Sequence, residues 1–84
     1  MNNTIEEAMT NFKIDLNIML VNGSMKNYEQ IANFTCGYTS ALFHSIGLIY
    51  EQMVAFEKVA EEFAVKHGFI DKEFYEQLHK KVGD

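Results

Sequence analysis

The feature that most constrains this chain is a charge-free stretch in its middle. The 20 residues "IANFTCGYTSALFHSIGLIY", Ile31 to Tyr50, contain no Asp, Glu, Lys or Arg, although Glu29 and Glu51 lie on either side. A helix that carries no charge around its circumference needs neighbours around most of that circumference. The stretch is therefore predicted to be buried on most sides.

The chain has little else with which to cover it. Its 84 residues form one domain, and a chain of this size buries only about 60–65% of its unfolded surface. One neighbouring helix covers one side of another, so part of the central stretch stays uncovered within a single copy. We expect the missing cover to come from a second copy of the chain, as a homodimer or higher oligomer, or from a different protein.

The apolar periodicity predicts an all-α fold. The chain has no Pro and five Gly, and its apolar residues recur three and four positions apart, which is typical of helices. We predict one helical domain, residues 1–84, with helices at about 5–21, 28–67 and 72–82. Asn27 and Gln30 have the spacing of a helix cap, and Gly23 and Gly68 are predicted stops. The central helix is expected to be long, with an interruption near Gly37 as the alternative.

Small and apolar residues of the central helix predict where copies meet. From Leu42 to Phe63 the apolar positions alternate four and three residues apart, which resembles a coiled-coil seam. Small residues at every fourth position allow helix backbones to approach closely. The predicted self-association interface consists of Gly37, Ala41, Leu42, Ser45, Ile46, Ile49, Met53, Phe56 and Phe63.

The polar residues of the same helix support an alternative. Asn33, Tyr38, Ser40 and His44 provide an amide, two hydroxyls and an imidazole. Between two subunits these groups could enclose a small polar ligand such as a nucleotide. The competing interpretation is that they satisfy one another across a wet interface.

Charge and hydropathy argue against a nucleic-acid partner and against a membrane. The net charge is −5, from twelve acidic residues against seven basic ones, all of them Lys. Nucleic-acid binders usually present a basic face and favour Arg, so no nucleic-acid partner is expected. The N-terminus has no secretory pattern, which predicts a cytoplasmic location. Ser, Thr, Asn and His dilute the central stretch below a confident membrane span; a weakly membrane-associated helical hairpin is a third alternative.

No motif predicts catalysis. Cys36 is the only cysteine, so the chain forms no internal disulfide and no thiolate zinc cage. It also lacks a phosphate loop and a nucleophile elbow. We therefore expect no cofactor, no metal and no enzymatic activity. The predicted function is that of a non-catalytic interaction protein that binds or inhibits a protein partner, as small adaptors, immunity proteins and phage-encoded inhibitors do. That comparison rests on size alone.

Overall fold

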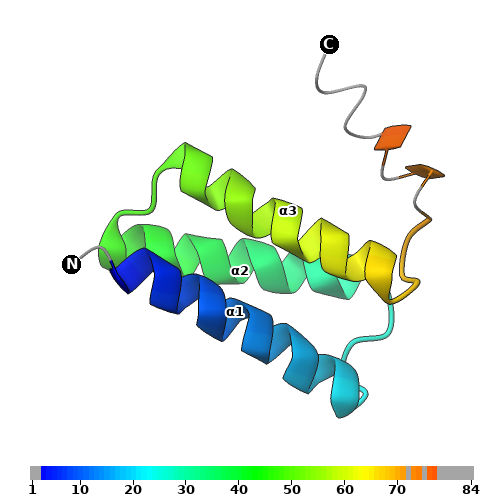
Figure 1. Cartoon of the computed structure of the whole chain (residues 1–84). Coiled ribbons are helices and arrows are strands. Elements are labelled where there is room, and N and C mark those ends of the chain that lie inside the picture. The colour runs from blue at the N-terminus through cyan, green and yellow to red at the C-terminus, as the bar shows by residue number, and fades with distance from the viewer. Residues whose placement is uncertain (1–2, 72, 75, 78–84) are drawn as a thin grey trace.

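Three helices arranged up, down and up make the fold (Figure 1). The computed structural model describes residues 3–71, 73, 74, 76 and 77, and within these the helices are α1 (Asn3–Val21), α2 (Tyr28–Ile46) and α3 (Tyr50–Lys66), with no strand. The all-α prediction is confirmed. The predicted C-terminal helix, 72–82, lies largely outside the described residues, although 73, 74, 76 and 77 have helical backbone.

The α1–α2 connection is formed by the residues that the sequence pattern singles out. Gly23 has a φ of 79°, a left-handed conformation that glycine adopts without a steric penalty. The Asn27 side chain caps α2 by accepting a 2.9 Å hydrogen bond from the backbone N–H of Gln30. The Gln30 side chain in turn accepts a hydrogen bond from the backbone N–H of Lys26. The predicted stop and cap are both confirmed.

The predicted central helix, 28–67, is broken at a position other than the one expected. α2 continues through Gly37 and ends at Ile46, and α3 starts at Tyr50. Gly47 ends α2 in a left-handed conformation, φ 70° and ψ 41°, and its N–H donates to the Phe43 carbonyl at 3.1 Å. Ile49 starts α3 with an extended backbone, and its N–H donates to the Gln52 side chain at 3.0 Å.

This break changes the meaning of the apolar seam. Because α2 and α3 are antiparallel, Leu42 and Met53 approach one core from two helices instead of following one another along a single helix. The buried Leu48 fills the turn between them. The expected coiled-coil seam from Leu42 to Phe63 is therefore wrong as a continuous stripe.

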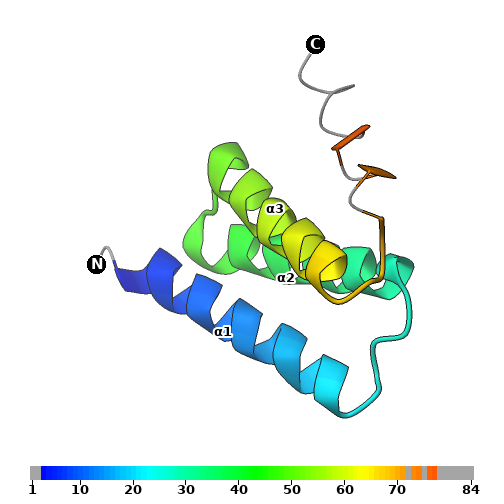
Figure 2. The same ribbon diagram turned by 45° about the vertical axis from the view of Figure 1, so that its right-hand side comes forward.

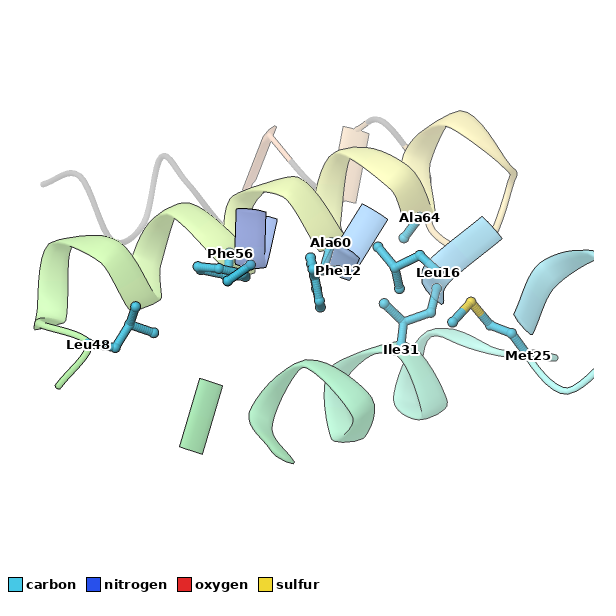
Figure 3. Packing of buried hydrophobic residues seen from close by; sticks show 9 residues of the cluster. Phe12, Leu16, Met25, Ile31, Leu48, Phe56, Ala60 and Ala64 are labelled. Carbon is cyan, nitrogen blue, oxygen red and sulfur yellow. The ribbon is translucent and has the colours of Figure 1, made fainter. Parts of the chain in front are cut away.

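The core lies between the three helices (Figure 3). Phe12 of α1 and Phe56 of α3 are fully buried at its centre, with ring centroids 5.2 Å apart. Leu48 closes one end of the core and Met25 the other. The edge-to-face packing of the Phe12 and Phe56 rings adds about 0.5–1.5 kcal/mol of stability beyond the contribution of the area that it buries.

Two threonines explain how a polar helix face enters this core. Thr35 and Thr39 are buried on α2. The Thr35 hydroxyl donates to the Ile31 carbonyl at 2.7 Å, and the Thr39 hydroxyl donates to the Thr35 carbonyl at 3.0 Å. These bonds within one helix satisfy the hydroxyls without a partner element. Among the described residues, no buried side-chain nitrogen or oxygen lacks a hydrogen-bond partner.

Candidate interaction surface

The chain's own helices shield only part of the charge-free stretch. Ile31, Thr35, Thr39 and Leu48 are buried in it, and three aromatic or aliphatic side chains are half-buried. Apart from the exposed Phe43 and Ile46, the remaining side chains of the stretch on α2 face solvent and are small or polar without charge. This exposed α2 face consists of Ala32, Asn33, Cys36, Gly37, Ser40, Ala41, His44 and Ser45.

The residues predicted for self-association divide into three groups. Phe56 is fully buried, so it offers no surface to a second copy. Leu42, Met53 and Phe63 are half-buried against the core. The other five are exposed: Gly37, Ala41, Ser45, Ile46 and Ile49.

A cluster of exposed apolar residues surrounds the α2–α3 turn. It consists of Phe43, Ile46, Ile49, Tyr50 and Val54, here called the turn-end patch. Tyr50 is 76% exposed, Ile49 54% and Phe43 51%. Because Gly47 ends α2 in a left-handed turn, side chains from the ends of two helices gather in one region. The patch adjoins the exposed α2 face, since Phe43 and Ile46 belong to the last turn of α2.

The predicted interface lacked Phe43, Tyr50 and Val54. A continuous helix places Phe43 and Tyr50 beside the seam rather than in it. The signal that could have found them is Gly47, three residues before Tyr50, as a turn that brings both segments to one end of the molecule.

The four residues predicted to hold a small ligand do not come together in one chain. Tyr38 faces the core, where its ring lies 5.1 Å from that of Phe12 and its hydroxyl donates to the Ala8 carbonyl at 3.4 Å. Asn33, Ser40 and His44 are exposed on the outer face of α2. The His44 ring is in edge contact with Phe43, with centroids 5.3 Å apart.

A small cleft lies between α2 and α3. Its volume is about 140 Å³, and its lining is Tyr28, Ala32, Thr35, Cys36, Glu57, Ala60 and Glu61. Burial raises the pKa of the Tyr28 hydroxyl above its ordinary value, and the nearby Glu61 and Glu57 carboxylates raise it further. Drug-sized ligand pockets have volumes of about 300–1,000 Å³. The cleft therefore suits a single side chain of a partner better than a small-molecule ligand.

No described helix combines the length and apolar character needed to cross a bilayer. In the same part of the chain, no group of three or more His, Cys, Asp or Glu residues is placed to hold a metal ion. Comparison of the chain with protein-family models, curated proteins and solved structures found no match.

Proposed function

We propose that this chain is a non-catalytic helical interaction protein, which self-associates through α2 and the α2–α3 turn and binds a protein partner. The observation that carries the proposal is the turn-end patch beside an α2 face without charge. The centres of protein interfaces are depleted in charged residues and enriched in aromatic ones. Phe43 and Tyr50 supply aromatic anchors in such a setting.

The exposure of the side chains in the turn-end patch supports this function. Its five side chains are each at least 36% exposed, and fully burying a residue such as Ile, Val or Phe contributes about 1.5–3 kcal/mol. Several exposed apolar side chains near one turn of a fold are a usual mark of an interaction site. The exposed small residues Gly37, Ala41 and Ser45 extend the surface along α2 and allow close approach of another helix.

The substitution Ile49→Asp tests self-association without weakening the fold. Ile49 occupies the N-cap of α3 with an extended backbone, a position at which Asp is favoured because its carboxylate accepts a backbone hydrogen bond. The variant is expected to unfold no more easily than the wild type. It should have a lower mass in light scattering at equal micromolar concentration, because it places a charge in the turn-end patch.

Lys66→Gln is the matched control. It changes the net charge by the same −1 at an exposed position in the last turn of α3, at the opposite end of that helix from the turn-end patch, and should leave the mass unchanged. A wild-type protein that is monomeric at these concentrations would count against self-association. An Ile49→Asp variant with the wild-type mass would exclude the turn-end patch.

Partner binding is tested with the same pair of variants as bait. Proteins captured from the native host by the wild type and by Lys66→Gln, but not by Ile49→Asp, would be partners of the turn-end patch. Equal capture by all three baits would contradict a partner site at the turn.

A further inference from the structure

A second apolar surface lies on the side of α1 that faces away from the core. Ile14, Ile18 and Val21, here called the rear strip, are 49%, 53% and 84% exposed. They are spaced four and three residues apart, so they share one face of the helix. Phe12 and Leu16 of the same helix are fully buried on the opposite face. The C-terminal half of α1 is therefore apolar on two sides.

The described part of the fold places nothing over the rear strip. α2 and α3 both lie on the same side of α1 (Figure 2). A shallow hollow of about 400 Å³ on the outer side is lined by Ile14, Asn17, Ile18, Val21 and Asn22. The ten residues from Leu16 to Met25 contain no Asp, Glu, Lys or Arg. Ile18 and Val21 thus lie in a second charge-free segment, whereas Ile14 lies between Lys13 and Asp15, and the hollow is rimmed by the amides of Asn17 and Asn22.

We propose that a second copy of this chain covers the rear strip, with the two α1 helices packed antiparallel about a two-fold axis near Ile18. This surface is distinct from the turn-end patch, and the inference does not depend on that patch.

The distribution of charge along α1 favours a second copy in this orientation. Glu6 and Glu7 are exposed at the N-terminal end of α1, and Lys26 is the only charged residue in the loop that follows its C-terminal end. Antiparallel pairing directs the carboxylates of each copy toward the loop of the other, and it also opposes the two helix dipoles favourably. Parallel pairing would bring four carboxylates together.

The strip is also complementary to itself. With Ile18 at the axis, Ile14 of one copy lies opposite Asn22 and beside Val21 of the second copy, and residues near the axis meet their own equivalents. A charged residue there would face a like charge, but Ile18 and its neighbours Asn17 and Met19 carry none. A stable interface buries about 800 Å² per partner. Three aliphatic side chains cannot supply that area alone, so the contact must include the polar rim residues Asn11, Asn17 and Asn22.

Disulfide trapping tests both the contact and its orientation. In a Cys36→Ser background, which removes the exposed native thiol, Ile18→Cys is expected to oxidise to a covalent dimer because the two sulfurs meet near the axis. Glu7→Cys is the matched control. At a rise of 1.5 Å per residue, the two Glu7 positions of an antiparallel pair are about 33 Å apart, so it should stay monomeric on non-reducing gels.

The disulfide-trapping result supports or overturns the antiparallel pair. Linkage of Ile18→Cys alone supports the antiparallel pair. Linkage of both variants to a similar extent shows a parallel pair or random collision and overturns the proposed geometry. Failure of Ile18→Cys to link shows that the strip is free or is covered by a different occupant, such as another protein, and overturns the inference.

A mass measurement separates this inference from the proposed function. Ile18→Lys replaces an exposed residue by a better helix former and should lower the mass by removing one interface. Glu62→Gln, at an exposed position of α3, changes the net charge by the same +1 and should not. If Ile49→Asp lowers the mass and Ile18→Lys does not, the rear strip is excluded while the turn-end patch stands. The opposite result excludes the patch and keeps the strip.

Discussion

At the scale of single residues, the ring of Phe12 contacts three other aromatic rings. Its centroid lies 5.7 Å from that of Phe34, 5.1 Å from Tyr38 and 5.2 Å from Phe56, and its side chain is fully buried. We expect Phe12→Ala to lower the free energy of unfolding by about 3–5 kcal/mol, because it removes these contacts and leaves a cavity. The total free energy of unfolding of a small domain is only about 5–15 kcal/mol. Urea denaturation followed by circular dichroism measures the loss.

Phe43→Ala provides the comparison, because Phe43 is 51% exposed and belongs to the turn-end patch. Its substitution is expected to change the free energy of unfolding by less than about 1 kcal/mol under conditions where the protein is monomeric. Similar losses for the two variants would contradict the central position of Phe12.

Two tyrosines are expected to lower the free energy of unfolding at alkaline pH. Burial raises the pKa of Tyr28 and of Tyr38, and neighbouring carboxylates, Glu61 and Glu57 for Tyr28 and Asp15 for Tyr38, raise it further. The unfolded tyrosines ionise near their ordinary pKa of about 10. The contribution of these groups to stability is therefore complete below that pH and is lost as the pH rises through the higher folded-state pKa values.

A comparison of the wild type with a variant that lacks both tyrosines isolates the effect of their ionisation on stability. We expect the free energy of unfolding of the wild type to fall more between about pH 9 and pH 11 than that of a Tyr28→Phe, Tyr38→Phe double variant, because phenylalanine has no group to ionise. Urea denaturation at the two pH values measures both slopes. Equal slopes would show that neither tyrosine contributes to the alkaline loss.

At the scale of the helices, one glycine within α2 and one at its C-cap are expected to respond to alanine in opposite directions. Gly47 has a φ of 70°, whereas Gly37 lies inside the helix, and a Cβ at either position meets no atom within 4 Å. Gly47→Ala should destabilise the fold by about 1 kcal/mol, because alanine is strained in the left-handed conformation. Gly37→Ala should stabilise it by roughly 0.5–1 kcal/mol through helix propensity. Thermal unfolding of both variants measures whether each is more or less stable than the wild type. A more stable Gly47→Ala variant would contradict a left-handed turn at Gly47 between α2 and α3.

The same two glycines show how far the sequence predicts the elements. The Asn27 cap and the stops at Gly23 and Gly68 could be predicted, because each depends on a local hydrogen bond or a local left-handed residue. The break at Gly47 could not be predicted from periodicity. The apolar spacing runs through it unchanged, and only the packing of α2 against α3 selects the turn.

The candidate surfaces were predictable in part for a related reason. Absence of charge identified a segment that the chain's own helices shield only in part, and Ile46 and Ile49 of the predicted interface are exposed. Phe56 had the same periodicity but is buried, because spacing along one helix does not say which neighbour fills which side. Ile14 and Ile18 were missed because the apolar face through Phe12 and Leu16 already accounted for a core-facing side of α1.

At the scale of the whole molecule, the two apolar surfaces lie toward opposite ends of the bundle. The turn-end patch is at the α2–α3 turn, and the rear strip is near the end of α1 that leads into the α1–α2 loop. A chain with two separate self-contacts of this kind forms assemblies larger than a dimer. Blocking either surface would then leave dimers, and blocking both would leave monomers.

Net charge predicts how such assembly depends on salt. Each copy carries −5, so association must overcome repulsion between like-charged molecules. The screening length is about 30 Å at 10 mM salt and about 8 Å at 150 mM. At centre separations of roughly 20 Å, this difference in screening reduces the repulsion by an amount that corresponds to at least about a tenfold change in affinity. The dissociation constant measured by sedimentation equilibrium is therefore expected to fall as salt rises over this range.

An interface held mainly by ion pairs, for example between Glu7 and Lys26, would weaken instead. A rise in the dissociation constant would thus show that charges, rather than the uncharged strip and patch, hold the copies together.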